Sequence, residues 1–291
     1  PEAFRKAVSK KTRAIFIESI ANPGGVVMDI ESIARVATEA GVPLVVDNTM
    51  ATPFLCQPFE WGADLVVHST TKFLSGQGNA VGGVVIDSGK FPWLGKEKFP
   101  SLSTPSPEYN GLTFAETFGD LAYTMYSHAI SLRDLGCAQS PMNAWITLNG
   151  VETLPLRMER HCNNGLAVAG FLENHPQVEW VSYAGLESSP YYKLGKKYMP
   201  DGSGSVFTFG VKGGYESGLT MLESVELFSH VANIGDTRSL ILHPASTTHR
   251  QLTEEQRIAA GAGPEVIRLS IGIECAEDII CDLEQALSSL S

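Results

Sequence analysis

One lysine stands in a setting suited to covalent chemistry. Lys72 lies in HSTTKFLSGQGNAVGG, three residues after an apolar run of strand type. A lysine that forms an imine must be reachable and partly deprotonated, which partial burial and nearby positive charge favour. Short hydroxyl side chains precede it (Ser69, Thr70, Thr71) and could bind a phosphate, while the glycines after it allow a ligand close to the backbone. Taken alone, the pattern also fits an ordinary solvated lysine, which is the commoner case.

A carboxylate at the end of an earlier strand changes that balance. Asp47 closes the apolar run PLVVD and precedes Lys72 by 25 residues. An unpaired carboxylate at that place would be costly. A pyridinium nitrogen would be a suitable partner, because a ring kept protonated accepts electrons from a substrate carbanion. The alternative is that Asp47 only caps the following DNT turn. Two strand ends with hydroxyl neighbours favour a shared site.

A buried cation is expected in the second half of the chain. Arg268 lies in VIRLSIGIE, a run typical of a strand. A guanidinium in such a run needs a carboxylate or phosphate partner, and its planar fork suits the α-carboxylate of a substrate. A structural salt bridge to Glu274 or Asp278 is the alternative that the sequence leaves open.

The elements that must position these residues are alternating strands and helices. A helix is predicted over Asp29–Ala40, with Asp29 as N-cap and Gly41 and Pro43 closing it. The strand-like runs are nearly continuous in apolar residues, as a sheet covered by helices on both faces requires. They are Ala14–Ser19, Pro43–Asn48, Asp64–Ser69 and Val81–Asp87. The sequence therefore predicts a doubly wound α/β domain with a mainly parallel sheet.

Polar residues follow the carboxyl ends of three successive strands. In an open α/β sheet, ligands bind at this edge. The pairs are Glu18 and Asn22, Asp47 and Thr49, and Ser69 and Thr71. A binding site at that edge follows from the pattern alone.

The second half of the chain has a different pattern. A loop rich in Pro, Ser and Gly precedes two predicted helices, of which the second is bent near Pro155. From about Val178, short strands mix with helices, which favours a smaller α+β domain. We predict the large domain over 1–150 and the smaller one, with its linking helix, over 151–291. The predicted helices are Phe114–Gly136, Asn143–His175, Gly218–Val231 and Glu277–Leu290.

Composition excludes several classes of protein. The net charge of −11 and the lack of a basic stripe argue against a nucleic-acid partner. The chain has no run of 18 apolar residues and no signal-peptide pattern at its start, so we expect no membrane span and a cytoplasmic location. Five cysteines without CxxC spacing, and histidines without HxxxH spacing, predict neither a disulfide framework nor a metal site.

Four segments carry a resemblance to a known family. ESIANPGG, VVDNT, HSTTKFLSGQG and IRLSIGIE together resemble the trans-sulfuration (Cys/Met metabolism) family of fold-type-I pyridoxal-phosphate enzymes. The resemblance covers essentially the whole chain. It implies pyridoxal 5'-phosphate as cofactor, with Lys72 as Schiff-base lysine and proton shuttle and Asp47 on the pyridine nitrogen. Ser69 and Thr71 would bind the cofactor phosphate, and Asn22 would reach the ring hydroxyl.

The resemblance also implies a substrate site and a reaction. Arg268, helped by Ser239, would hold the substrate carboxylate, which Asn22 would also reach. Three further segments look most like family members that convert O-acetylhomoserine and sulfide to homocysteine and acetate in methionine biosynthesis. They are FPSLSTPSPEYNGLTFAETFGD, NGVETLPLRMERHC and FSHVANIGDTRSLILHPASTTHRQL. Cystathionine γ-synthase and methionine γ-lyase share the cofactor residues and stay open as alternatives, as does an inactive fragment. The family further suggests a homotetramer.

The sequence departs from the family at its start. Family members begin with a long segment that has no counterpart here, so the chain resembles one that begins midway through the large domain. That segment would supply a glycine-containing phosphate loop, an aromatic side chain that stacks on the cofactor and residues that reach a neighbouring subunit. We expect it on a separate chain, or removed, and expect this piece alone to be inactive or poorly folded.

Overall fold

The first half of the chain folds around a four-stranded sheet. The computed structural model describes residues 1–95 and 97–290. The sheet order is β1-β2-β3-β4; the first three strands are parallel, and β4 runs antiparallel to β3. The strands are β1 (Ile15–Glu18), β2 (Leu44–Asp47), β3 (Leu65–Ser69) and β4 (Gly83–Asp87). The mainly parallel sheet is as predicted, and the carboxyl ends of β1, β2 and β3 meet at one edge.

Helix α2 (Ile30–Ala40) packs one apolar side against this sheet. The Asp29 side chain accepts a hydrogen bond from the Ser32 backbone N–H at 3.3 Å and so caps the helix. Gly41 ends it with φ of 62°, a conformation that glycine adopts without strain. Both features agree with the predicted helix. The residues that α2 buries are Ile30, Ile33, Ala34, Val36 and Ala37.

The two faces of the sheet are covered unequally. Alternate strand residues lie on opposite faces. The face toward α2 buries Ile15, Ile17, Leu44 and Val46. On the other face Phe16 is 58% exposed and Val85 54% exposed. Helices were predicted on both faces. Among the described residues Leu65 is buried on this second face, whereas Phe16 and Val85 stay exposed there, so its cover is partial. An apolar strand residue shows that its face needs cover, but not which segment supplies it.

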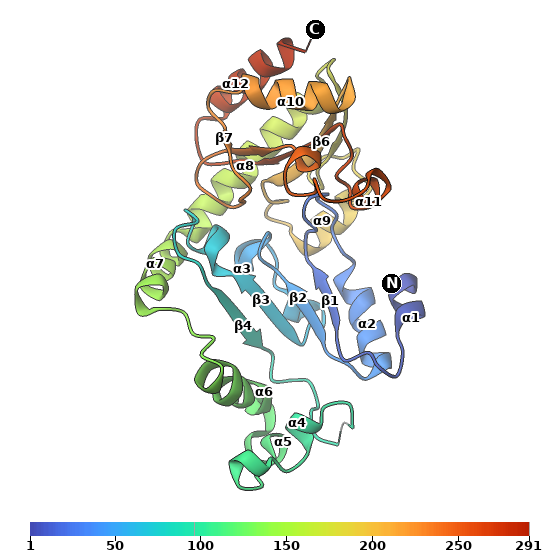
Figure 1. The fold of residues 1–291 in the computed structure, drawn as a ribbon, viewed down its shortest axis with the longest axis vertical. Coiled ribbons are helices and arrows are strands. Elements are labelled where there is room, and N and C mark those ends of the chain that lie inside the picture. Colours follow the sequence, from blue (N-terminus) through green and yellow to red (C-terminus); the bar gives the residue numbers. More distant parts are fainter. Residues whose placement is uncertain (96, 291) are drawn as a thin grey trace.

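The segment after β4 forms a small aromatic cluster of its own. It contains α4 (Pro100–Ser103), α5 (Phe114–Phe118) and α6 (Ala122–Tyr126), which extend away from the end of β4 (Figure 1). The helical stretch predicted over Phe114–Gly136 is helical from Phe114 to Asp134, but not as one regular helix: a 3-10 turn separates α5 from α6, and a π-helical stretch (Ser127–Asp134) follows. Gly119, with φ of 53°, breaks the helix where the turn begins.

Helices α7 (Pro141–Glu152) and α8 (Leu154–Glu173) lead into the second half. The predicted bend near Pro155 is present as a break at Thr153. The first turns of α8 bury Leu154 and Met158 in the core of the first sheet, whereas its later turns contribute to a second core. Helix α8 contributes to both cores and runs from the first half of the molecule into the second (Figure 1), so a domain division at residue 150 stays a prediction.

The second half is built on a five-stranded sheet of order β5-β6-β9-β8-β7, antiparallel except for the β7–β8 pair. Its strands are β5 (Val178–Ser182), β6 (Val206–Val211), β7 (Ser229–His230), β8 (Leu240–Leu242) and β9 (Val266–Ser270). Its helices are α9 (Tyr192–Tyr198), α10 (Gly214–Ser224), α11 (Glu254–Ala259) and α12 (Ala276–Ser288). The shorter helices of the first half are α1 (Glu2–Ala7) and α3 (Thr52–Leu55). The smaller α+β arrangement agrees with the prediction.

The helix predicted to reach Val231 is wrong after Ser224. The carboxylate of Asp282 on α12 accepts hydrogen bonds from the backbone N–H groups of Glu226 (2.8 Å), Leu227 (2.9 Å) and Phe228 (3.3 Å). Because these three N–H groups donate to Asp282, they cannot form the backbone hydrogen bonds of a continuing helix. The chain then forms β7. No helix within residues 1–95 and 97–290 is long and apolar enough to cross a membrane.

Candidate active site

A cavity of about 160 Å³ opens at the carboxyl edge of the first sheet. It lies where the pattern of polar strand ends predicted a binding site. The polar side chains that line it are Glu18, Asn22, Asp47, Thr49, Ser69 and Lys72. Four residues expected to bind the cofactor are therefore brought together: Asn22, Asp47, Ser69 and Lys72.

Two carboxylates form one side of the cavity. Glu18 and Asp47 are paired in register on β1 and β2. Asp47 Oδ1 accepts the Thr49 backbone N–H at 2.9 Å, so Asp47 caps its turn as well as lining the cavity. Glu18 Oε2 accepts the Asn22 backbone N–H at 2.9 Å. Burial raises the pKa of Glu18 and Asp47 adds to the effect, while the Asn22 N–H opposes both.

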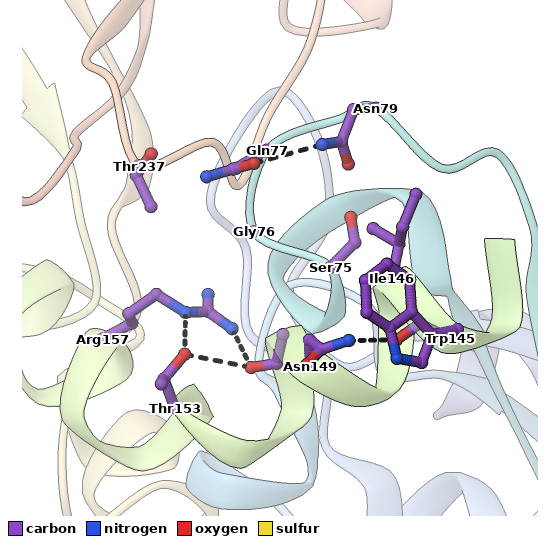
Figure 2. Close-up of a pocket in the computed structure, with 11 residues that line it drawn as sticks. Ser75, Gly76, Gln77, Asn79, Trp145, Ile146, Asn149, Thr153, Arg157 and Thr237 are labelled. Atoms are coloured by element: carbon purple, nitrogen blue, oxygen red, sulfur yellow. Dashed lines mark hydrogen bonds between the residues drawn. The ribbon is translucent and has the colours of Figure 1, made fainter. Parts of the chain in front are cut away.

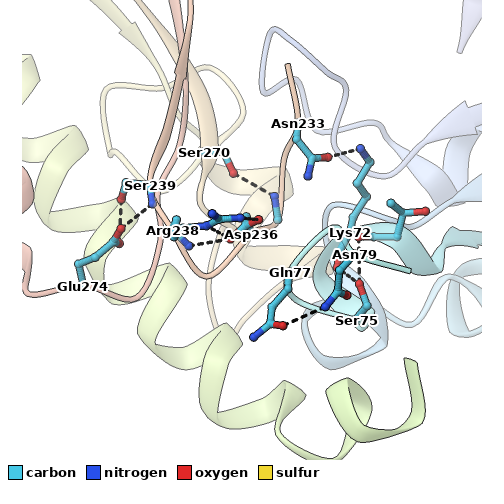
Figure 3. A network of polar contacts seen from close by, with 12 residues as sticks. Lys72, Ser75, Gln77, Asn79, Asn233, Asp236, Arg238, Ser239, Ser270 and Glu274 are labelled. Carbon is cyan, nitrogen blue, oxygen red and sulfur yellow. Dashed lines mark hydrogen bonds and ion pairs between the residues drawn. The ribbon is translucent and has the colours of Figure 1, made fainter. Parts of the chain in front are cut away.

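Lys72 lines the same cavity from an irregular stretch of backbone. The π-helical segment Thr70–Leu74 follows β3, and Lys72 departs from helical geometry within it, with φ of −90° and ψ of −129°. Its Nζ donates a hydrogen bond to Oδ1 of Asn233 (Figure 3). Burial, and secondly the charge of Arg268, lowers the pKa of Lys72. The amine is therefore deprotonated at a lower pH than that of a solvated lysine, as imine formation and proton transfer require.

Asn233 is a site residue that sequence reasoning missed. It lies in a loop of the second half, 161 residues from Lys72. Its side chain contacts Lys72, and its backbone carbonyl accepts a hydrogen bond from Arg268 Nη2 at 3.1 Å. An asparagine in a loop carries no distinctive pattern, so only the folded structure reveals the contact.

Arg268 completes the network from β9. Its Nη1 donates to Oδ1 of Asn22 at 3.2 Å. Burial lowers the pKa of Arg268 to about 10. The salt bridge to Glu274 that the sequence left open is not formed, because Glu274 accepts hydrogen bonds from the backbone N–H (2.6 Å) and hydroxyl (2.9 Å) of Ser239. The oxygens bound to Arg268 are uncharged amide oxygens, so a buried cation without an anionic partner lies beside Asn22, as recognition of a carboxylate requires.

Three predicted residues do not line the cavity: Arg268, which contacts it through Asn22, and Thr71 and Ser239. The hydroxyl of Thr71 donates to the carbonyl of Gly82 at 3.3 Å and accepts the Gly82 N–H at 3.1 Å. Ser239 is fully buried, and its hydroxyl accepts the Gly272 N–H at 2.9 Å while it donates to Glu274. The structure does not place either hydroxyl in the cavity.

The residues present fit a pyridoxal-type cofactor. A cavity of about 150 Å³ can hold a benzene-sized ring, and this one is of that size. Asp47 offers a carboxylate to a ring nitrogen, and Lys72 offers an amine to an aldehyde. The two groups flank a single cavity, which is the arrangement that the cofactor requires.

The chain is similar over its whole length to curated enzymes. It is 50% identical to an O-acetyl-L-homoserine sulfhydrylase of Leptospira meyeri, covering all of this chain and 67% of the relative. It is 47% identical to a homocysteine synthase of Schizosaccharomyces pombe, covering 99% of this chain and 67% of the relative. The chain thus spans about two thirds of the length of these proteins.

A solved structure is similar in fold as well. It is a putative O-acetylhomoserine (thiol)-lyase of Campylobacter jejuni, solved with a pyridoxyl-lysine monophosphate residue. Superposition gives a TM-score of 0.95 at 40% identity, covering 99% of this chain and 68% of that one. The predicted fold-type-I α/β architecture is confirmed by this match. The profile of the Cys/Met metabolism PLP-dependent enzymes matches residues 1–288, and the chain belongs to that family.

Proposed function

We propose that the protein carrying this chain catalyses a γ-replacement, which converts O-acetylhomoserine and sulfide to homocysteine and acetate. The observation that carries the proposal is the similarity of the whole chain, site included, to relatives named O-acetyl-L-homoserine sulfhydrylase and homocysteine synthase. The cavity between Asp47, Lys72 and Asn22 supports it, because it combines cofactor groups with a neighbouring cation for an amino-acid carboxylate.

The cofactor residues have separate roles in this proposal. Bound pyridoxal phosphate supplies an electron sink for negative charge at the substrate Cα. Asp47 keeps the pyridine nitrogen protonated, and Lys72 Nζ attaches the cofactor. The Ser69 hydroxyl binds the phosphate. Thr71 would join it by exchanging its contact with Gly82 for a phosphate oxygen.

The substrate residues act on the amino acid itself. Arg268 and Asn22 hold the α-carboxylate. Lys72 removes the proton from Cα, must give that proton up, and only then removes one from Cβ, because its amine holds a single added proton at a time. The Cγ–O bond breaks and acetate leaves with its electron pair. Sulfide forms the new C–S bond at Cγ, and Lys72 returns the protons to Cβ and Cα. Ser239 would help Arg268 only indirectly, since its hydroxyl contacts Glu274.

The test uses protein supplied with pyridoxal phosphate, O-acetylhomoserine and sulfide. Homocysteine and acetate should form in equal amounts, measured by mass spectrometry and an acetate assay. Cysteine in place of sulfide tests for a cystathionine γ-synthase, and methionine alone tests for a γ-lyase. Faster product formation in either comparison than with sulfide would contradict the proposal.

Replacement of Lys72 by alanine should abolish the visible absorbance of the lysine-bound cofactor and lower turnover by about 10²–10⁴-fold, the usual contribution of a positioned acid–base group. Lys193→Ala, at an exposed position, is the matched control and should leave both unchanged. A Lys72→Ala protein that keeps both the absorbance and the turnover would show that another residue attaches the cofactor.

We also propose that the protein acts as a homotetramer in the cytoplasm on these two small-molecule substrates. Sedimentation analysis of the purified protein tests the oligomeric state, and cell fractionation tests the location.

A further inference from the structure

Arg157 is a buried guanidinium without a carboxylate partner among the hydrogen bonds described for it. It lies in the first turn of α8, and its fork donates to four uncharged oxygens. These are the carbonyls of Phe73 (2.8 Å), Leu74 (3.4 Å) and Gly150 (2.7 Å) and the hydroxyl of Thr153 (3.2 Å). Figure 2 shows the guanidinium with Thr153 at the side of a cavity of about 340 Å³. A structural ion pair does not explain this arginine.

Two of these carbonyls belong to the segment that carries Lys72. The Ser75 N–H donates a hydrogen bond to the carbonyl of Thr70 at 3.1 Å, and the Gly76 N–H donates one to the carbonyl of Lys72 at 2.8 Å. The carbonyls of Phe73 and Leu74, which come directly after Lys72, are bound by Arg157. Carbonyls at the end of a helical segment need such partners. Arg157 therefore satisfies the carbonyls at the end of the Lys72 segment with a side chain from another helix.

The backbone of α7 and the side chain of Arg157 lie close to the main chain of this segment. A Cβ added to Gly150 on α7 would lie 2.3 Å from the Leu74 carbonyl oxygen. Gly76 has φ of 84°, and a Cβ there would lie 2.8 Å from Arg157 Nη1. Because both positions are glycines, α7 and the guanidinium contact the main chain of the segment directly. The position of Lys72 is thus tied to the position of α7 and α8.

We propose that Arg157 is a positioning residue for Lys72. It joins the carbonyls after Lys72 to the carboxyl end of α7 and the start of α8, and so holds the Lys72 amine at the distance that proton transfer requires. The inference rests on the proposed function, in which Lys72 moves protons at Cα and Cβ. A misplacement of about 1 Å in a reacting group can cost about 10²-fold in rate. Removal of the Arg157 guanidinium should therefore lower turnover.

The experiment compares Arg157→Met and Arg157→Lys with Arg160→Met, an exposed arginine on the same helix. Arg157→Met should lower kcat by about 10²-fold and leave KM for O-acetylhomoserine unchanged, since Arg268 and Asn22 bind the carboxylate. Arg157→Lys should recover only part of kcat, because one ammonium cannot span four acceptors. Arg160→Met should resemble the unsubstituted protein.

A second readout needs no catalysis. In cofactor-free protein, hydrogen exchange of residues 70–76 should become faster in Arg157→Met, while exchange in α12 stays unchanged. Equal acceleration in both segments, or an unchanged kcat, would overturn the inference and leave Arg157 as a general stabilising residue. If the unsubstituted protein forms no homocysteine, the proposed function fails instead. Hydrogen exchange, with borohydride trapping of pyridoxal phosphate on Lys72, then still tests Arg157.

Discussion

At the scale of single residues, the site is defined by a buried cation that lacks an anionic partner. Arg268 donates to Asn22 and to the carbonyl of Asn233, and it lowers the pKa of Lys72 through its charge. It therefore has two separable effects: recognition of a carboxylate, and repulsion of the protonated lysine. Substitutions that keep or remove the charge can distinguish the two.

Arg268→Met should lower kcat/KM for O-acetylhomoserine by about 10²-fold, because charge-assisted hydrogen bonds contribute about 1.5–3 kcal/mol. Loss of the charge should also raise the pKa of Lys72, so that an amine reagent labels Lys72 in cofactor-free protein only at higher pH. Arg268→Lys should keep the labelling profile and still lose affinity. Arg250→Met, at an exposed position, is the control. An unchanged profile in Arg268→Met would show that burial alone lowers the pKa of Lys72.

At the scale of elements, the contact of α7 with the Lys72 segment depends on Gly150. Gly150→Ala should destabilise the protein by about 1–3 kcal/mol, the usual cost of overpacking, since its Cβ would meet the Leu74 and Ser75 carbonyls. Gly170→Ala on α8 is the matched control, because its Cβ meets nothing within 4 Å. Urea unfolding measures both. An equal effect of the two substitutions would show that helix propensity, not contact, governs Gly150.

At the scale of the whole molecule, His161 joins the two halves of the structure. Its Nδ1 is 2.7 Å from the carbonyl of Ile271, which follows β9, and its ring packs edge-on against Phe73 beside Lys72. Burial lowers the pKa of His161 to about 4. In the unfolded chain the histidine takes up a proton near pH 6.5, whereas in the folded chain it stays neutral until about pH 4. Stability is therefore lost as pH falls through this interval.

Between pH 7 and pH 5 this histidine should account for a loss of about 2 kcal/mol in the free energy of unfolding. His161→Asn should lose less over the same interval, since the amide can still donate to the Ile271 carbonyl but does not titrate. Urea unfolding at the two pH values measures the difference, with His230→Asn at an exposed position as control. An equal acid loss in His161→Asn and the parent would contradict this assignment.

Local patterns along the chain were enough to predict most of the first sheet and the edge at which the site lies. Runs of apolar residues predicted β1, β2, β3 and β4, because strand formation and burial depend on residues that are neighbours in the sequence. Asp47 and Lys72 could be proposed as partners because parallel strands end at the same edge. The family resemblance then assigned roles to residues of that edge, and it added Arg268 and Ser239, which the strand-end pattern had not placed there.

Only the tertiary structure decided which groups surround Lys72. Asn233 contacts it from 161 residues away, and Arg157 binds the Phe73 carbonyl from 84 residues away. The tertiary structure also decided the conformation of the segment after Ser224, where hydrogen bonds to the Asp282 carboxylate prevent the helix from continuing. Such contacts depend on a distant side chain reaching a particular backbone group. A sequence pattern reports what a residue needs, and the folded chain determines which partner satisfies it.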